Sequence, residues 1–104
     1  MIRIAVMYPN VLDEEFNVEY YQNKHLPLVK QAYEEYGLVS VELDVAVSKL
    51  GRNAAPYLAI AYLTFNDMPA FLDAIKNAGK VVNEDVKDFT NTQPTIQISE
   101  SITC

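Results

Sequence analysis

The stretch YLAIAYLTF at residues 57–65 is apolar on both of the faces that an extended chain presents. A short apolar run of this kind is typical of a strand that is buried on both sides. We therefore expect a central strand here, in a sheet whose two faces are both covered.

Three further segments alternate between apolar and polar residues, as strands with one apolar face do. They are IRIAVMY (2–8), LVSVELDVAVSK (38–49) and PTIQISESIT (94–103). In the second of them, the apolar residues Val39, Val41, Leu43, Val45 and Val47 are expected to face one way. PNVLDEEFN (9–17) and LGRNAAP (50–56) read as a turn and a loop.

Two helices are expected between these strands. The first is capped by Asn17 and ends at Gly37, and the second is capped by Asp67 and ends at Gly79. NEDVKDFT (83–90) adds a short helical turn. The apolar stripe of the first helix contains Val18, Tyr21, His25, Leu28, Val29, Ala32 and Tyr36.

The predicted order is β-α-β-β-α-β, which defines an α+β fold of the ferredoxin-like type. An antiparallel sheet carries both helices on one face, and right-handed crossovers give the strand order 4-1-3-2. The 104 residues fit a single domain, 1–104.

The second face of this sheet is mixed. Apolar residues such as Ala5, Met7, Ile60 and Tyr62 alternate there with polar ones such as Glu42. Soluble monomers rarely expose an apolar patch of this size, so we expect a second copy to cover it in a homodimer. A reversed assignment of the two faces, or loops folded over the sheet, are the alternatives.

Composition excludes several classes of partner. The formal net charge of −6 disfavours nucleic acid and anionic membranes. The sequence has no apolar run long enough to span a membrane and no secretory signal, and its single cysteine, Cys104, has no zinc-binding cluster around it. We expect a cytoplasmic protein with no metal and, in the absence of phosphate-binding glycine motifs, no cofactor.

The segment YYQNKHLPLVKQAY (20–33) contains the only histidine, His25. Pro27 cannot donate to the carbonyl of Asn23, so the helix is expected to kink or break beside His25 and to open a small cavity over the sheet. His25 and Tyr21 would point into it. An imidazole that transfers protons and a phenol that binds an oxygen atom suit proton abstraction beside a carbonyl.

Purely structural roles for these residues are the alternatives. A lone histidine on an apolar stripe is often a core residue bonded to a backbone carbonyl. Gln97 is a candidate site residue, but a solvent-facing or interface position explains it as well. Most tyrosines are expected in the core or as cavity lining.

Several blocks together resemble the EthD family of small bacterial proteins. They are YPN (8–10), Phe16, YYxxKHLPLV (20–29), APY (55–57), Phe65 and FTNTQPTIQISE (89–100). The resemblance covers nearly the whole chain. It implies a dimeric α/β barrel in which two sheets face each other, with the family histidine matched by His25 and with Tyr20 or Tyr21 beside it.

One position departs from the family pattern. Short members often have a second histidine in the third strand, within a GHLxF-like stretch, where this chain reads AYLTF with Tyr62 in its place. A phenol, whose pKa is near 10, is a poor base at neutral pH but still donates hydrogen bonds.

The resemblance leaves the function open between an enzyme and a binder. The first hypothesis is a cofactor-free isomerase or dehydratase acting on a small oxygenated or aromatic acid or lactone. Its catalytic residues are His25 and Tyr21, and its substrate-binding residues are Tyr20, Tyr62 and Gln97. The alternatives are a non-catalytic small-molecule-binding protein of a degradation pathway, a plain structural dimer, or the reductase that the names of some members suggest.

Overall fold

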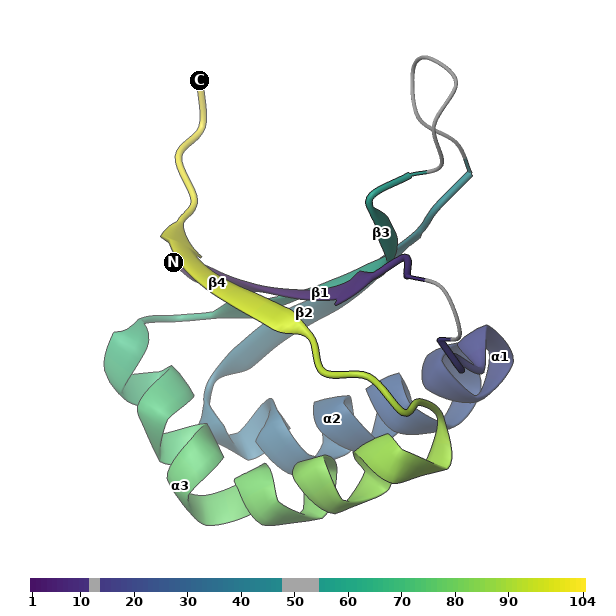
Figure 1. The fold of residues 1–104 in the computed structure, drawn as a ribbon. Helices are drawn as coiled ribbons and strands as arrows, with labels where there is room; N and C mark the ends of the chain where they lie inside the picture. Colours follow the sequence, from purple (N-terminus) through teal and green to yellow (C-terminus); the bar gives the residue numbers. More distant parts are fainter. Residues whose placement is uncertain (12–13, 48–54) are drawn as a thin grey trace.

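A computed structural model describes residues 1–11, 14–47 and 55–104. Its strands β1 (Ile2–Pro9), β2 (Leu38–Val45), β3 (Tyr57–Phe65) and β4 (Thr95–Glu100) form one antiparallel sheet in the order β2-β3-β1-β4. Figure 1 shows the helices on one face of the sheet, with the other face uncovered. The predicted α+β fold and strand order 4-1-3-2 are thereby confirmed.

The first helical segment consists of four consecutive pieces. They are α1 (Val18–Tyr20), a π-helical turn η1 (Tyr21–His25), α2 (Leu26–Tyr33) and a 3-10 turn η2 (Glu34–Tyr36). The side chain of Asn17 accepts a hydrogen bond from the backbone N–H of Tyr20 at 3.0 Å, as a capping residue does. Gly37 ends the segment with a φ of 96°, so both predicted boundaries are correct.

Instead of the kink or break expected beside His25, the structure has a π-helical turn. The helix continues past Pro27, and it widens for one turn before it, where the N–H of Leu26 donates to the carbonyl of Tyr21 instead of that of Gln22. We attribute the widened turn to the proline, which has no N–H and crowds the preceding turn.

The widened turn also moves the buried face of the helix. Leu26 and Tyr33 are buried, whereas Leu28 and Ala32, which the regular helical spacing placed on the stripe, are only half-buried. A π-helical turn contains one extra residue, so every later position is rotated relative to an ideal α-helix. Of the predicted stripe, Tyr21, His25 and Val29 are buried, whereas Val18, Leu28, Ala32 and Tyr36 are half-buried, with Ala32 and Tyr36 packed against the core.

The second helix, α3 (Met68–Asp85), does not end at Gly79 as expected and continues into the 3-10 turn η3 (Val86–Asp88). Asp67 caps it by accepting from the N–H of Ala70 at 2.9 Å. Gly79 is buried inside the helix, close to Ile75 and to the hydroxyl of Tyr33. It therefore lies inside a continuing helix that packs beside α2, and not at a helix end.

The predicted second strand needs a correction at both ends. Its pairing register shifts between Leu38 and Ser40, so Leu38 is buried and Val39 is 49% exposed. Val47 lies beyond the end of β2 and is 98% exposed. The other predicted residues at its end, 48–49, lie outside the described residues, as do residues 12–13 of the expected turn and residues 50–54 of the expected loop.

The core lies between the helices and the sheet, with Ile4, Tyr8, Leu63 and Phe65 among its buried members. On the uncovered face, Ala5 pairs with Tyr62 and with Gln97, and Met7 pairs with Ile60. These apolar side chains are half-buried. Among the described residues, no helix has both the length and the apolar character needed to cross a membrane.

Candidate functional site

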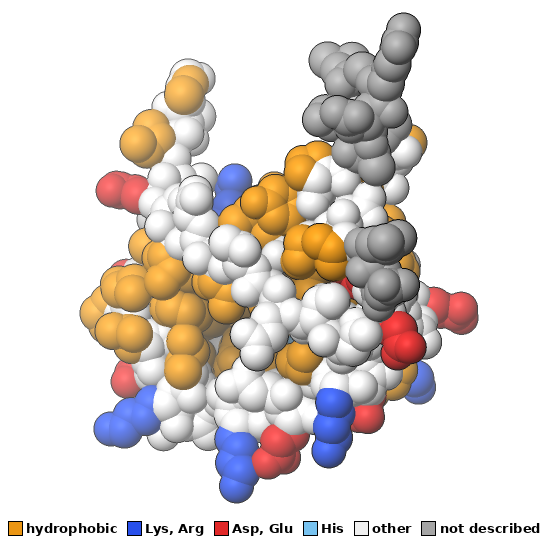
Figure 2. All heavy atoms as spheres, viewed as in Figure 1, with side chains coloured by type: hydrophobic (Ala, Val, Ile, Leu, Met, Phe, Trp, Pro, Cys, Tyr) orange, Lys and Arg blue, Asp and Glu red, His pale blue; other side chains and the backbone are white. Residues whose placement is uncertain are grey.

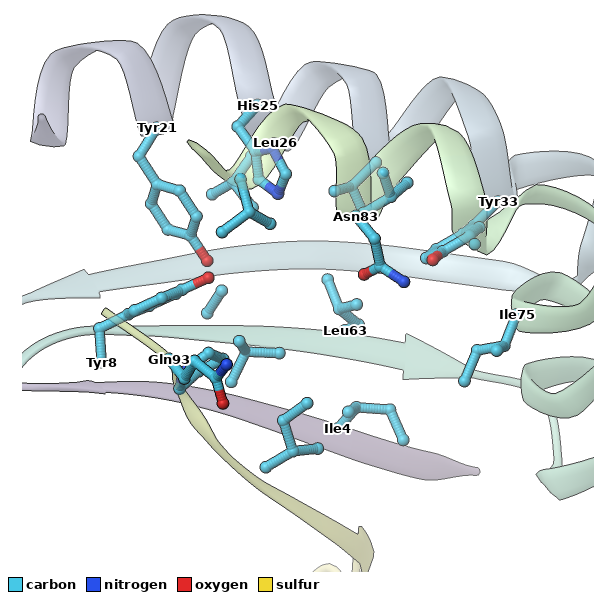
Figure 3. Close-up of a pocket in the computed structure, with 18 of the residues that line it drawn as sticks. Ile4, Tyr8, Tyr21, His25, Leu26, Tyr33, Leu63, Ile75, Asn83 and Gln93 are labelled. Carbon is cyan, nitrogen blue, oxygen red and sulfur yellow. The ribbon is translucent and has the colours of Figure 1, made fainter. Parts of the chain in front are cut away.

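A cavity of about 520 Å³ lies between the helices and the sheet. Its floor is formed by apolar residues of β1 and β3, among them Ile4 and Leu63, and its walls by α2, α3 and the segment that leads into β4 (Figure 3). A volume of this size is sufficient for a small organic ligand.

The lining of the cavity is mainly apolar, with a few polar groups. Those labelled in Figure 3 are Tyr8, Tyr21, His25, Tyr33, Asn83 and Gln93. Ile75 and Ile96, which are 44% and 57% exposed, form part of its rim together with the exposed Asn83 and Gln93. Figure 2 shows the hydrophobic side chains that gather on this side of the molecule, over α3 and β4.

His25 is 4% exposed and makes a hydrogen bond with a carboxylate. Its Nδ1 lies 2.8 Å from Oδ2 of Asp85, and the other carboxylate oxygen, Oδ1, accepts from the hydroxyl of Tyr20 at 2.8 Å. Because a carboxylate only accepts, Nδ1 carries the proton and Nε2 has a free lone pair. The imidazole lines the cavity, so this lone pair is available to a ligand.

Local structure brings these three residues together. Tyr20 directly precedes the widened turn, His25 is the last residue of that turn, and Asp85 is the last residue of α3. The ring of His25 stacks on that of Tyr21, with centroids 5.4 Å apart and planes 14° apart, and it contacts Phe89 at 4.5 Å between centroids. Aromatic contact and the hydrogen bond to Asp85 thus fix the orientation of the imidazole.

Burial and hydrogen bonding set the charges of the pair. Burial lowers the pKa of His25, and it outweighs the hydrogen bond to Asp85, which by itself raises that pKa. Burial raises the pKa of the Asp85 carboxyl, but the hydrogen bonds from His25 and Tyr20 outweigh it and hold this pKa below its ordinary value. At neutral pH the pair is therefore a neutral imidazole and a carboxylate, the state that a general base requires.

Two phenols lie near His25 in the cavity. The hydroxyls of Tyr8 and Tyr21 point toward each other in Figure 3. Burial raises the pKa of Tyr8 to about 12, and it raises that of Tyr21 further. Both phenols therefore stay protonated at any working pH and act as hydrogen-bond donors to an oxygen atom of a ligand.

The residues proposed from sequence fall into two groups. His25 and Tyr21 line the cavity together, and Tyr20 holds the carboxylate behind His25. Tyr62 and Gln97 lie on the uncovered face of the sheet instead, where the Arg3 guanidinium sits 5.7 Å from the centre of the Tyr62 ring and Gln97 donates to Ser99 at 3.1 Å. Strand alternation separates Tyr62 from His25, because its neighbours Ala61 and Leu63 face the helices.

Asp85 and Tyr8 are absent from the residues that sequence reasoning proposed. Tyr8 continues the alternation of Ile2, Ile4 and Val6, which places it over the cavity. Asp85 follows Val82 by three residues on the inner side of α3, a position visible only if the helix is extended past Gly79. A carboxylate on an otherwise apolar stripe was the available signal.

The arrangement is suited to proton transfer. It combines a neutral imidazole with a fixed tautomer, two phenol donors and an apolar enclosure. The described residues contain no group of three or more His, Cys, Asp or Glu side chains that could hold a metal ion.

Comparison with known proteins gives a family and a fold. The EthD domain profile matches residues 9–93. An EthD-like protein from Ralstonia eutropha JMP134 has a solved structure with 24% identity and a TM-score of 0.91, covering 98% of this chain and 92% of its own. A search of curated proteins finds no match.

Two more distant structures share the fold. An ethyl tert-butyl ether D (EthD) family protein from Bacillus halodurans C-125 has 19% identity and a TM-score of 0.78, covering 98% of this chain and 99% of its own. A dimeric ferredoxin-like protein from an uncultured marine organism has 9% identity and a TM-score of 0.54, covering 99% of this chain and 94% of its own.

Proposed function

This chain belongs to the EthD family, and we propose that it is a cofactor-free enzyme that moves a proton on a small oxygenated or aromatic acid or lactone. The observation that carries the proposal is the pair formed by His25 and Asp85, which leaves Nε2 of a neutral imidazole available in the cavity. The reaction class is an isomerisation or a dehydration beside a carbonyl group.

Each residue has a role in the proposed reaction. Nε2 of His25 takes a proton from the carbon next to the carbonyl, and the electron pair of that C–H bond moves onto the carbonyl oxygen. The hydroxyls of Tyr21 and Tyr8 donate to this oxygen as it becomes negative. The imidazolium then returns the proton, either to a different carbon, which shifts the double bond, or to a departing hydroxyl, which leaves as water.

Asp85 and Tyr20 are positioning residues. Asp85 holds the tautomer of His25 and stabilises the imidazolium that forms in the reaction. Tyr20 occupies the second carboxylate oxygen and fixes the plane of that carboxylate.

The test is the isomerisation of unsaturated lactones, followed by ultraviolet absorbance, together with exchange of the protons next to the carbonyl in heavy water. The wild-type chain is expected to accelerate both, and His25→Gln to lower the rate by about a hundredfold or more. Lys24→Gln, an exposed neighbour on the same turn, is the control and should leave the rate unchanged. An undiminished rate in His25→Gln would show that the proposed base is wrong.

A non-catalytic small-molecule carrier is the second candidate, favoured by the mainly apolar lining of the cavity. Ligand binding without turnover in the wild-type chain would identify it. In that case His25→Gln should lower the ligand affinity by no more than the loss of one hydrogen bond allows.

We further propose that residues 1–104 form one domain that works as a homodimer in the cytoplasm. The half-buried apolar residues on the uncovered sheet face support a second copy, as does the related structure described as dimeric. The single cysteine and the acidic composition suit a reducing compartment.

A further inference from the structure

The cavity lining has an unusual charge composition. Of the described residues that line it, none is Lys, Arg, Asp or Glu, and His25 is the only titratable group besides the three tyrosines. Burial keeps the tyrosines protonated and the histidine neutral at neutral pH. The inner surface is therefore uncharged under working conditions.

A negative charge lies directly behind this surface. Asp85 supports His25 from outside the lining, and both of its carboxylate oxygens already accept hydrogen bonds. The chain as a whole carries a formal charge of −6. A carboxylate that entered the cavity would lose its hydration without meeting a cation, which weakens its binding.

A cationic ligand is disfavoured by a related argument. No carboxylate lines the cavity, and the oxygens of Asp85 are engaged by His25 and Tyr20. The phenol oxygens and Nε2 of His25 can accept from an ammonium group, but they are neutral and supply no negative charge to replace its hydration. A neutral molecule with an acceptor oxygen uses these groups best.

We propose that the cavity selects an uncharged, largely apolar ligand that bears one carbonyl oxygen, such as an aryl ketone or a lactone, and that it excludes carboxylic acids. The carbonyl oxygen accepts from Tyr8 and Tyr21 beside His25, and the apolar body lies against residues such as Ile4 and Leu63. The exposed amides of Asn83 and Gln93 at the rim bind a second polar group of the ligand. This inference rests on the proposed function and narrows its substrate class from acids and lactones to the uncharged members.

The experiment compares four naphthalene derivatives that share one ring system. They are acetonaphthone, which carries a carbonyl, ethylnaphthalene, which carries no oxygen, naphthoate, which is anionic, and naphthylmethylamine, which is cationic. Equilibrium binding to the wild-type chain is measured by calorimetry at about pH 8, where carboxylic acids are ionised and the amine is largely protonated.

We expect acetonaphthone to bind most tightly. Ethylnaphthalene should bind about five- to tenfold more weakly, because the hydrogen bonds from the phenols are lost. Naphthoate should bind about a hundredfold more weakly, or below detection. Binding of naphthoate or of the amine that equals or exceeds that of acetonaphthone, or no binding of any probe, would overturn the inference.

Conservative variants test the position of the carbonyl. Tyr8→Phe and Tyr21→Phe should each lower the affinity for acetonaphthone severalfold and leave that for ethylnaphthalene unchanged. Tyr36→Phe, in η2 and outside the cavity, is the matched control. Circular dichroism confirms that each variant is folded; should one phenylalanine variant unfold, the other carries the test. Unchanged acetonaphthone affinity in a folded variant would contradict the proposed pose.

The binding experiment separates this inference from the proposed function, because none of its probes needs to react. If the affinities follow the expected order but no lactone turnover is found, the proposal of an uncharged ligand is supported and the proposed enzymatic function is rejected. If turnover requires His25 but naphthoate binds more tightly than acetonaphthone, the proposed enzymatic function is supported and the proposal of an uncharged ligand is rejected.

Discussion

At the scale of single residues, the carboxylate of Asp85 determines what His25 can do. One of its oxygens fixes the proton on Nδ1, and the other is held by Tyr20. The chain has no other histidine, and histidine is the side chain whose ordinary pKa lies near neutrality, so His25 is the first candidate for a titration there that changes activity or stability.

Asp85→Asn is expected to lower turnover by about tenfold to a hundredfold. An asparagine side chain has one acceptor oxygen and one amide donor, so it cannot accept from both His25 and Tyr20. The variant also removes the carboxylate charge that, together with the hydrogen bond, raises the pKa of His25, so the acid limb of the pH–rate profile should shift to lower pH. Both effects are measured in one series of rates against pH.

Glu84→Gln is the control for Asp85→Asn. Glu84 precedes Asp85 on the same helix, but it is exposed and only 4.0 Å from Lys80 at the surface. The turnover rate of Glu84→Gln and the pH dependence of that rate should equal those of the wild type. An Asp85→Asn profile that also matches the wild type would remove Asp85 from the site.

Stability should depend on pH through His25. Its pKa is lower in the folded state than in the unfolded chain, so below about pH 6.5 the unfolded chain binds more protons and folding is weakened. The free energy of unfolding should fall as the pH is lowered from about 7 to about 5.5, as measured by urea denaturation.

The variant His25→Gln should show a smaller dependence on pH in the same range. Asp85, whose pKa is also lowered, contributes stability that is lost only in stronger acid, as the pH falls below its ordinary value near 3.8. An identical pH dependence in wild type and His25→Gln would exclude the histidine as its source.

At the scale of helices and strands, the two glycines among the described residues, Gly37 and Gly79, have opposite roles. Gly37 has a φ of 96°, and a Cβ atom there would lie 2.9 Å from Cβ of Ala70. Gly79 is in the interior of α3, where a Cβ atom would meet Ile75 at 3.5 Å and Tyr33 at 3.9 Å, which are ordinary contacts.

Alanine at these two positions should therefore change stability in opposite directions. Gly37→Ala is expected to destabilise the fold by about 1–3 kcal/mol, because of backbone strain and the contact with Ala70. Gly79→Ala should stabilise it by about 0.5–1 kcal/mol through helix propensity. Thermal and urea unfolding of the two variants check both signs, and a destabilised Gly79→Ala would show that the glycine is required for packing of α3 against α2.

The sequence patterns predicted the order and most boundaries of the helices and strands, but not every residue's role within them. Asn17, Asp67 and Gly37 were recognisable because capping and left-handed backbone depend on residues close in the chain. Gly79 was misjudged and Asp85 was missed because their surroundings depend on the first helical segment, which is distant in sequence and places Tyr33 beside Gly79, and His25 and Tyr20 beside Asp85. The exact form of the distortion at Pro27 was also not predictable, since a kink, a break and a π-helical turn all relieve the same clash.

At the scale of the whole molecule, the sheet has one face toward the cavity and one without a cover. The strand β3, predicted to be buried on both sides, has its second side open within this chain (Figure 1). The cavity and the proposed dimer interface therefore lie on opposite faces, so substitutions can separate assembly from binding.

A charge on the uncovered face should break the proposed dimer. Light scattering is expected to give about twice the monomer mass of 11.7 kDa for the wild type and the monomer mass for Met7→Glu. Leu72→Glu, at a position on α3 that is 53% exposed, is the control and should remain dimeric. A monomeric wild type would reject the dimer, and a dimeric Met7→Glu would place its interface elsewhere.

The π-helical turn makes the first helical segment tolerant of one single-codon event. The turn from Tyr21 to Leu26 holds one residue more than an α-helical turn, and the residues between Tyr21 and His25 are exposed. Deletion of one of them, such as Asn23, would convert the bond from Leu26 to Tyr21 into an α-helical one and leave Tyr21 in nearly the same orientation relative to α2. During evolution, an in-frame loss of three nucleotides is therefore compatible with the fold within this turn, whereas the same loss in the regular part of α2 would rotate the residues before it by about 100° relative to those after it.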